Sequence, residues 1–295
     1  MSPKLLAHIA LFSVAVIYGL NYSIAKDVMP YYLQPRAFIL VRVFGAVVLF
    51  WLISFLFKPE KIDRKDWPRI FFAALFGVAG NQISFFEGLN LTSPVSASII
   101  MTTNPIVVLG LSVIIGQIKL TWARIAGLVL GLSGALLLIL KGFSLDALSV
   151  SENGLGNFLI FVNASSYGCY LVVVKPLMEK YDAPTVIRWV FTIGLLLVAP
   201  FGIQGVLNAP VSEYTTQIWL EIGYVTVFTT FLAYLMNIFA LKTVTSTTVS
   251  FYIYLQPLVA GLVAVFTGAD SFHTNMFVAA TLIFTGVYFV SFYKR

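Results

Sequence analysis

Residues 5–26 read LLAHIALFSVAVIYGLNYSIAK, and residues 155–175 read LGNFLIFVNASSYGCYLVVVK. A helix needs about 20 mostly apolar residues to cross the hydrocarbon core of a bilayer, and both stretches have this length and character. Both end on Lys, and Tyr18-Gly19 in the first recurs as Tyr167-Gly168 in the second, 149 residues later. The chain is therefore predicted to contain two copies of one membrane-crossing helix.

Matches continue outward from these two helices through both halves of the chain. Lys26 and Pro35 recur as Lys175 and Pro184 at the same offset. At an offset of 152 residues the matched pairs are Trp67 and Trp219, Phe76 and Phe228, Leu89 and Leu241, Pro105 and Pro257, Gly116 and Gly268, and Gly134 and Gly286. We therefore predict two related five-helix domains, at residues 1–145 and 146–295.

Composition places the chain in a broad class. Hydrophobic residues make up 59% and charged residues 10% of its 295 residues, whereas a soluble domain carries about 25% charged residues. This argues against a cytosolic enzyme, a disordered chain and a nucleic-acid binder. Cys169 is the only cysteine, which excludes a disulfide framework and a thiolate metal site within the chain.

Apolar runs between turn residues predict ten membrane-crossing helices. Their expected spans are Leu5–Lys26, Pro35–Phe57, Trp67–Gly88, Pro94–Gly116, Thr121–Leu140, Leu155–Lys175, Pro184–Gly205, Gln217–Ala240, Ser246–Gly268 and His273–Tyr293. With the N-terminus inside, 14 of the 18 Lys and Arg residues fall near helix ends on the inner side. Because cytoplasmic loops carry an excess of Lys and Arg, both termini are predicted to be cytoplasmic.

Each copy holds five predicted helices, and five is an odd number. The second copy must then enter the membrane from the opposite side, which predicts an all-α membrane protein built as an inverted-topology repeat. Such repeats are typical of secondary transporters, because two equivalent halves can alternately open a central site. The repeat also favours keeping the first helix over its removal as a signal peptide, since the sixth helix would otherwise have no counterpart.

Three segments carry a family resemblance. YGLNYSIAK (residues 18–26), LVRVF (residues 40–44) and LNLTSPVSA (residues 89–97) with Asn104-Pro105 resemble motifs of the drug/metabolite transporter superfamily, EamA-like branch. The segment from Leu241 to Gln256-Pro257 repeats the third of these. The resemblance implies ten helices, cytoplasmic termini and a central cavity that carries small metabolites, with amino acids, nucleoside-like compounds and drugs among the substrates. The Gly-Glu that relatives commonly have after the fourth helix is Gly116-Gln117 here.

Polar side chains recur at helical spacing inside several of the apolar spans. Thr226, Thr230, Tyr234 and Asn237 follow one another at steps of 4, 4 and 3, which is one face of an α-helix. Polar groups inside a membrane protein should face protein or a water-filled cavity. We therefore predict a shared substrate site lined by Tyr18, Asn21, Asn81, Glu87, Asn104, Asn163, Tyr167, Tyr170, Tyr234, Asn237, Tyr252 and Gln256. The alternative is that the Ser and Thr side chains bond to their own helices and that Asn side chains join neighbouring helices.

Two charged residues fall within the predicted spans of the first half. Glu87 has three interpretations: a proton-coupling site, a counter-ion for an amine substrate, or an interfacial carboxylate that reaches lipid headgroups or pairs with Lys26 or Arg42. Arg42 has two possible roles. In a functional role it would attract an anionic group to the cavity. In a structural role, which is the favoured expectation, it would snorkel to the interface or neutralise a carboxylate.

Two pairs of repeat-equivalent residues are expected to break helices or act as gates. Pro105 and Pro257 lie about halfway along the fourth and ninth helices, where proline removes a backbone donor and frees a carbonyl; a packing kink is the alternative. Lys26 and Lys175 end their helices on opposite sides of the membrane, so each is a candidate gate for its own side.

These patterns together predict a secondary transporter for a small organic metabolite, amino acid-like or drug-like. It is expected to act by alternating access, as a monomeric exporter in the plasma membrane. The alternatives are an uncoupled facilitative carrier and a membrane-embedded enzyme. No catalytic residue, metal or cofactor is predicted, because His8 and His273 start helices on opposite sides of the membrane and cannot share a metal site.

Overall fold

The computed structural model of the chain describes residues 2–57, 60–92, 94–140, 152–266 and 274–291. Within these ranges every regular element is a helix, and no strand occurs. The fold is therefore all-helical, as predicted.

The first half contains helices that match the first five predicted spans. They are α1 (Pro3–Val28), α2 (Pro35–Ser54), the 3-10 turn η1 (Arg64–Asp66), α3 (Trp67–Ala74), the π-helical segment η2 (Leu75–Ala79), α4 (Gly80–Leu91), α5 (Pro94–Met101), α6 (Asn104–Ile114) and α7 (Trp122–Leu140).

The second half follows the same order. Its elements are α8 (Glu152–Met178), α9 (Ala183–Leu207), the 3-10 turn η4 (Val211–Glu213), α10 (Thr216–Tyr224), the π-helical segment η5 (Val225–Leu232), α11 (Ala233–Leu241), α12 (Ser246–Phe251), the 3-10 turn η6 (Tyr252–Tyr254), α13 (Leu255–Phe266) and α14 (Thr274–Ser291).

Helix starts follow the local sequence. Ser2 accepts a hydrogen bond from the Leu5 amide at 3.2 Å, and proline follows it at the first position of α1, where its missing donor costs nothing. Thr215 and Thr245 cap α10 and α12 in the same way. Among the residues that the structure describes, six helical segments are long and apolar enough to cross a membrane: Pro3–Val28, Pro35–Ser54, Arg64–Leu91, Gly154–Met178, Ala183–Leu207 and Thr216–Leu241. The predicted domain boundary at 145/146 and the predicted ends at Gly268, His273 and Tyr293 lie outside the described residues.

Apolar side chains also cover the outside of these helices. Phe55, Leu196 and Leu220 are 78%, 69% and 69% exposed. Soluble monomers rarely expose large contiguous apolar surfaces, so this outer surface suits contact with lipid.

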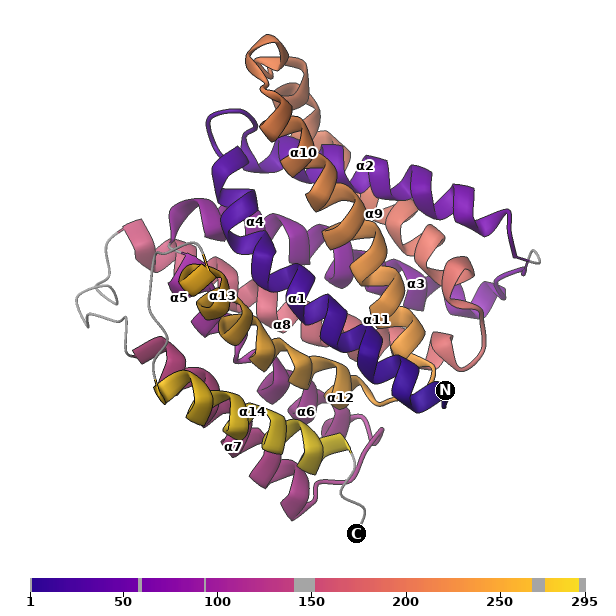
Figure 1. Cartoon of the computed structure of the whole chain (residues 1–295). Coiled ribbons are helices and arrows are strands. Elements are labelled where there is room, and N and C mark those ends of the chain that lie inside the picture. The colour runs from indigo at the N-terminus through magenta and orange to yellow at the C-terminus, as the bar shows by residue number, and fades with distance from the viewer. Residues whose placement is uncertain (1, 58–59, 93, 141–151, 267–273, 292–295) are drawn as a thin grey trace.

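The helices of the two halves are interleaved, and the pairing follows the repeat. α2 packs along α9, and α7 along α14, at opposite sides of the bundle (Figure 1). α1 packs on α11 and α13, while its repeat equivalent α8 packs on α4 and α6. Each of these four contacts of α1 and α8 thus has a counterpart in which the two halves are exchanged.

Two equivalent glycines allow α1 to approach α13 and α8 to approach α6. A Cβ on Gly19 would lie 2.7 Å from Val259 Cγ1, and a Cβ on Gly168 would lie 3.1 Å from Val107 Cγ1. Gly19 and Gly168 differ by 149 residues, and Val107 and Val259 by 152, so both contacts obey the sequence repeat. Small residues let membrane helices approach closely, which explains why glycine stands at both positions.

The π-helical segments also occupy equivalent places. The offset of 152 carries Leu75–Ala79 onto residues 227–231, inside Val225–Leu232. A π-helical turn bonds residue i to i+5 and is often found at functional sites. It leaves main-chain carbonyls free for side-chain donors, and it rotates the residues after it relative to an ideal α-helix.

Charged side chains join the loops at one end of the bundle. Lys180 bonds Asp63 and also Asp66 Oδ2, the latter at 2.6 Å, and Tyr181 donates to Asp66 Oδ2 at 2.8 Å. The two carboxylates raise the pKa of Lys180 above its ordinary value. Lys242 bonds Asp182 at 2.5 Å on the same side. We call these residues the ionic end.

Aromatic side chains dominate at the opposite end of α9, about 37 Å away at 1.5 Å per residue. Tyr214 donates to the Tyr32 carbonyl at 3.0 Å, and their rings meet edge to face with centroids 6.0 Å apart. Tyr31 packs on Tyr32 and bonds Glu213 at 2.9 Å, while Trp219 packs on Tyr214. We call these residues the aromatic end.

Candidate functional site

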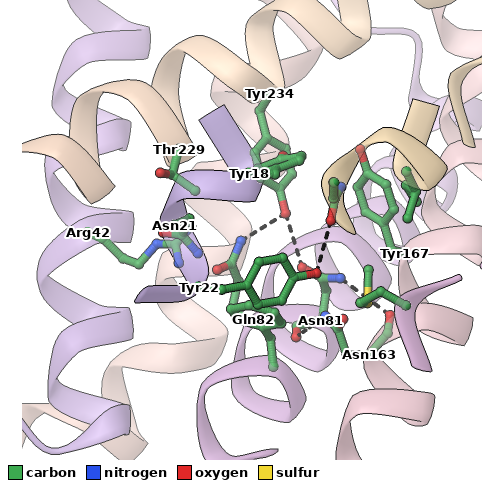
Figure 2. A pocket seen from close by; sticks show the side chains of 14 residues that line it. Tyr18, Asn21, Tyr22, Arg42, Asn81, Gln82, Asn163, Tyr167, Thr229 and Tyr234 are labelled. Carbon is green, nitrogen blue, oxygen red and sulfur yellow. Dashed lines mark hydrogen bonds between the residues drawn. The ribbon is translucent and has the colours of Figure 1, made fainter. Parts of the chain in front are cut away.

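A pocket opens near the centre of the bundle, between helices of both halves (Figure 2). It encloses about 490 Å³, its open side included. The pocket is lined by Tyr18, Asn21, Tyr22, Arg42, Asn81, Gln82, Phe85, Met101, Asn163, Tyr167, Thr229, Tyr234, Ile253 and Gln256. Among these fourteen residues Arg42 is the one with a charged side chain.

Hydrogen bonds across the pocket join the two halves. Tyr22 on α1 donates to Gln256 Oε1 on α13 at 2.9 Å, and Gln82 on α4 donates to the Tyr234 hydroxyl on α11 at 2.8 Å. Both bonds are buried, and Figure 2 draws the bond between Gln82 and Tyr234 as a dashed line. The pocket wall is therefore held by contacts between the halves rather than within one of them.

The π-helical segment η2 supplies a main-chain acceptor to this network. The Tyr234 hydroxyl lies 2.8 Å from the Gly77 carbonyl and 3.1 Å from Asn81 Oδ1, and its single proton serves one of them at a time. Ser166 on α8 donates to the neighbouring Phe76 carbonyl at 2.8 Å. The irregular turn thus fixes side chains of the other half against the pocket.

Two asparagines join α4 and α8 along one side of the pocket. Asn163 Nδ2 donates to the Asn81 carbonyl at 2.8 Å, and Asn81 Nδ2 donates to the Asn163 carbonyl at 3.4 Å. This agrees with the expectation that asparagine joins helices in membranes. Asn163 Oδ1 nevertheless has no hydrogen-bond partner among the described residues. This oxygen, at the pocket wall, can therefore accept a hydrogen bond from a ligand.

Arg42 is buried rather than directed to the interface. Its side chain is 2% exposed, Nε donates to Thr230 Oγ1 at 2.8 Å, and the guanidinium lies 4.5 Å from the Phe86 ring centroid. The predicted snorkelling is therefore wrong, because the residue sits too deep on α2. The described residues contain no ion pair that includes Arg42, so the structure places no carboxylate beside it to be neutralised.

The structure brings seven of the twelve predicted site residues into this pocket: Tyr18, Asn21, Asn81, Asn163, Tyr167, Tyr234 and Gln256. A smaller hollow beside it is lined by Asn237 and Tyr252 and shares Tyr18, Tyr167, Ile253 and Gln256 with the pocket. Asn237 donates to the Tyr167 hydroxyl at 2.9 Å, and His8 bonds the Tyr252 hydroxyl at 2.7 Å.

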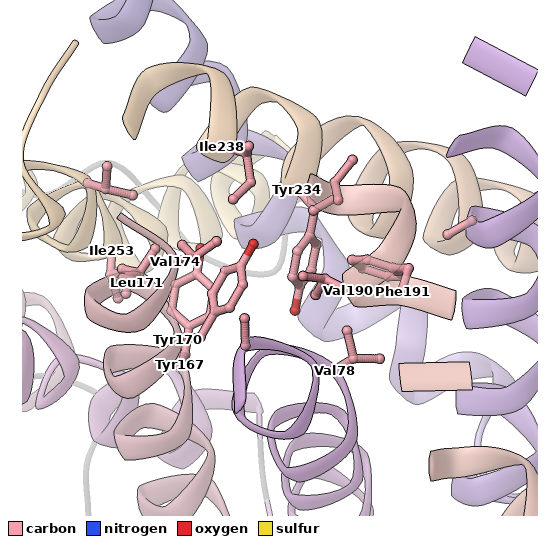
Figure 3. Packing of buried hydrophobic residues seen from close by; sticks show 14 of the residues in the cluster. Val78, Tyr167, Tyr170, Leu171, Val174, Val190, Phe191, Tyr234, Ile238 and Ile253 are labelled. Carbon is pink, nitrogen blue, oxygen red and sulfur yellow. The ribbon is translucent and has the colours of Figure 1, made fainter. Parts of the chain in front are cut away.

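Three predicted residues lie away from both hollows. Glu87 forms an ion pair with Arg36 at 2.6 Å, which is a partner that the sequence interpretation did not name. Asn104 donates to the Ala164 carbonyl at 2.5 Å and so joins α6 to α8. Tyr170 lies in the core behind the pocket, 6.0 Å from Tyr234 between ring centroids (Figure 3).

The two prolines and two lysines occupy matched positions. The predicted fourth span is interrupted at residues 102–103, just before Pro105, and the predicted ninth span changes to a 3-10 turn just before Pro257. Lys26 donates to the Leu89, Asn90 and Thr92 carbonyls, and Lys175 donates to the Leu241 carbonyl. In this structure both lysines therefore bind helix C-termini.

Six lining residues were not predicted: Tyr22, Gln82, Phe85, Met101, Thr229 and Ile253. For Arg42, which also lines the pocket, a cavity role was the less favoured of two interpretations. Tyr22 and Gln82 directly follow predicted residues, Asn21 and Asn81, so their adjacency was the available signal. Thr229 was missed because the predicted stripe assumed an α-helix. In η5, Thr226 packs on Gly45 and Thr230 lies under Arg42, while Thr229 lines the pocket.

Comparison with known proteins identifies the family. The model of the EamA-like transporter family matches residues 5–140 and again residues 154–292. The chain belongs to the EamA-like transporter family. It is accordingly a multi-pass membrane protein of the drug/metabolite transporter group.

Other members of the EamA-like family are similar over much of the chain. The uncharacterized transporter YyaM of Bacillus subtilis is 24% identical over 77% of this chain and 75% of its own length. The probable terminal-alkyne amino-acid exporter of Streptantibioticus cattleyicolor is 27% identical over 53% of this chain and 52% of its own. A crystal structure with 18% identity superposes with a TM-score of 0.73 and covers 96% of each chain, so this EamA-like chain has a known fold.

Proposed function

We propose that this EamA-like chain is a secondary transporter that moves a small organic metabolite across the plasma membrane by alternating access. The observation that carries the proposal is the central pocket, which is lined by α1, α2 and α4 of one half and by α8, α11 and α13 of the other. A site shared between two equivalent halves can be opened to either side by a change in how the halves pack.

The proposal includes ten crossings in two inverted five-helix domains, with both termini cytoplasmic. The reciprocal packing of α1 with α11 and of α8 with α4 supports two equivalent halves. Basic residues at the ionic end, including Lys180 and Lys242, support a cytoplasmic location for that end, because cytoplasmic loops are rich in Lys and Arg. We take the transporting unit to be a monomer, since the pocket is complete within one chain.

Export is the proposed direction, and the substrate is amino acid-like or drug-like. The supporting observation for both is the similarity to a protein named as a probable amino-acid exporter. Tyrosine rings and amide groups together make the pocket amphipathic, which suits a solute with a polar group and an apolar portion.

An uncoupled facilitative carrier is the second candidate. The observation in its favour is that no lining residue of the described pocket is a carboxylate, while Glu87, the proposed proton-coupling group, pairs with Arg36 outside it. Proton coupling then depends on Glu87 exchanging partners during the transport cycle.

The test is counterflow in proteoliposomes that contain the purified chain. Vesicles loaded with unlabelled solute should accumulate the labelled solute transiently and saturably, for at least one member of a metabolite panel. A proton gradient should drive net flux in the coupled case and have no effect in the uncoupled case. Absence of flux for every solute, together with turnover of a membrane substrate, would favour a membrane-embedded enzyme instead.

A further inference from the structure

Arg42 leaves part of its hydrogen-bonding capacity unused. Nε donates to Thr230 and the guanidinium face covers Phe86, but neither terminal nitrogen, Nη1 nor Nη2, donates to any described residue. Arginine stays charged in proteins and presents paired donors that match the two oxygens of a carboxylate. The free edge of Arg42 is therefore suited to a bidentate anion.

Asn21 also lacks a protein partner in the pocket. Its side chain is 3% exposed, Oδ1 has no hydrogen bond, and no described residue bonds its amide group. Figure 2 shows the Arg42 guanidinium reaching into the pocket beside Asn21. Buried polar groups are normally hydrogen-bonded. These two neighbours therefore indicate a ligand that offers acceptor oxygens to Arg42 and to the Asn21 Nδ2 group, while Asn21 Oδ1 can accept from a donor of the same ligand.

The repeat shows that the fold does not require these polar groups. The position equivalent to Arg42 in the second half is Phe191, which packs on Tyr234 with ring centroids 4.9 Å apart. The position equivalent to Asn21 is Tyr170, 6.0 Å from the same ring. Matched scaffold positions thus carry a polar pair in one half and an aromatic pair in the other.

We infer that Arg42 binds the carboxylate of the transported solute, with Asn21 as a second donor, and that the apolar part of the solute lies toward Tyr167 and Tyr234. The inference rests on the proposed transport function and adds a substrate class to it. A single arginine among the lining residues fits a monocarboxylate better than a dianion, because no second cation is present at the described pocket to balance another charge.

The experiment compares carboxylates with their neutral or cationic amides. The probes are phenylacetate with phenylacetamide, and L-phenylalanine with L-phenylalaninamide. Two quantities are measured on the purified full chain: the ligand-induced rise in melting temperature in detergent, and counterflow in proteoliposomes. We expect each carboxylate to bind at least tenfold more tightly than its amide and to be the better counterflow substrate.

Variants connect this preference to the site. Arg42→Gln should abolish the preference and Arg42→Lys should retain part of it, because a point charge remains without the paired donors. Arg36→Gln is the matched control: it removes another α2 arginine, outside the pocket, and should leave the preference unchanged. If Arg42→Gln does not fold, Thr230→Val and Asn21→Leu, which keep the charge, should each reduce the preference.

Two outcomes would overturn the inference. One is an equal or greater affinity of wild-type protein for the amides, and the other is a carboxylate preference that survives in folded Arg42→Gln. Either could occur while counterflow of some neutral solute continues, which would reject the role of Arg42 and keep the transport function. Absence of counterflow for the whole panel would instead reject the transport function.

Discussion

Lys26 and Lys175 form the same contact in the two halves of the molecule. Lys26 Nζ donates to the Leu89 carbonyl at 2.8 Å, and Lys175 Nζ donates to the Leu241 carbonyl at 2.6 Å. Leu89 and Leu241 are themselves repeat-equivalent and lie at the ends of α4 and α11. Each lysine therefore satisfies carbonyls that a helix end leaves without a partner and complements the negative end of the helix dipole.

Replacing these lysines should destabilise the protein to unequal degrees. Lys26→Met removes three hydrogen bonds to carbonyls, and Lys175→Met removes one. Since a hydrogen bond to a charged group contributes about 1.5–3 kcal/mol, Lys26→Met should lower the melting temperature more. Thermal unfolding in detergent measures both values. Equal and negligible shifts would contradict a capping role, whereas a stable protein with altered flux would point to gating.

Tyr234→Phe should weaken both packing and transport. The change removes the hydroxyl that accepts from Gln82 and lies 2.8 Å from the Gly77 carbonyl, and leaving a buried donor unsatisfied costs about 1–3 kcal/mol. We expect a lower melting temperature and a several-fold loss of counterflow. Tyr31→Phe is the matched control, because Tyr31 is 69% exposed and its hydroxyl bonds Glu213 at the surface. Wild-type behaviour of Tyr234→Phe would show that the network is dispensable.

Gly19→Ala should separate α1 from α13. The added Cβ would lie 2.7 Å from Val259 Cγ1, and overpacking of this kind typically costs about 1–3 kcal/mol. Gly223→Ala serves as a control, because nothing lies within 4 Å of a Cβ built there. The double variant Gly19→Ala, Val259→Ala should recover stability. Failure of that rescue would mean that Gly19 is needed for another reason.

Glu87→Gln should have a small effect on stability. The Arg36 side chain of this pair is 58% exposed, and exposed ion pairs contribute about 0–1 kcal/mol. Transport measured from pH 5.5 to 8.5 should keep its pH profile if the carrier is uncoupled. A shifted or flattened profile would instead establish Glu87 as a coupling group.

Lys180→Gln should loosen the ionic end. The folded protein raises the pKa of Lys180 through its bonds to Asp63 and Asp66. A group with a raised pKa stabilises the folded state below its unfolded pKa, and this contribution is lost as pH rises through the folded value. The variant should therefore differ from wild type at neutral pH and converge with it at strongly alkaline pH. Labelling of a cysteine introduced in place of Ile62, in a background that lacks Cys169, measures the opening. Labelling that does not change with pH in either protein would contradict the prediction.

The positions of the helices could be predicted from the sequence because the apolar runs that indicate them are long and recur in both halves of the chain. Apolar runs placed α1, α2, α8 and α9 within a few residues of their observed ends. At Pro105 and Pro257 the sequence predicted either a helix break or a packing kink, since proline acts on its own backbone. The structure has an interruption at residues 102–103 and a 3-10 turn at Tyr252–Tyr254.

The sequence was insufficient where a residue's role depends on contacts from distant helices. The π-helical turn in η5 shifted the polar stripe, so that Thr229 rather than Thr226 reached the pocket. Glu87 and Arg36, which form an ion pair, are 51 residues apart, and no local pattern connects them. The depth of Arg42 likewise depends on how α2 packs against α9 and η5, which helical periodicity does not specify.

The ionic and aromatic ends differ in how they respond to dissolved salt. Salt screens exposed charge pairs such as Lys180 with Asp63, whereas salts excluded from protein surfaces, such as sulfate, strengthen apolar contacts such as those of Tyr32 with Tyr214. Raising the concentration of such a salt should therefore loosen one set of loops and tighten the other in the same molecule. The concentration of such a salt in the buffer therefore determines which end of the protein opens first, and no amino-acid substitution is needed.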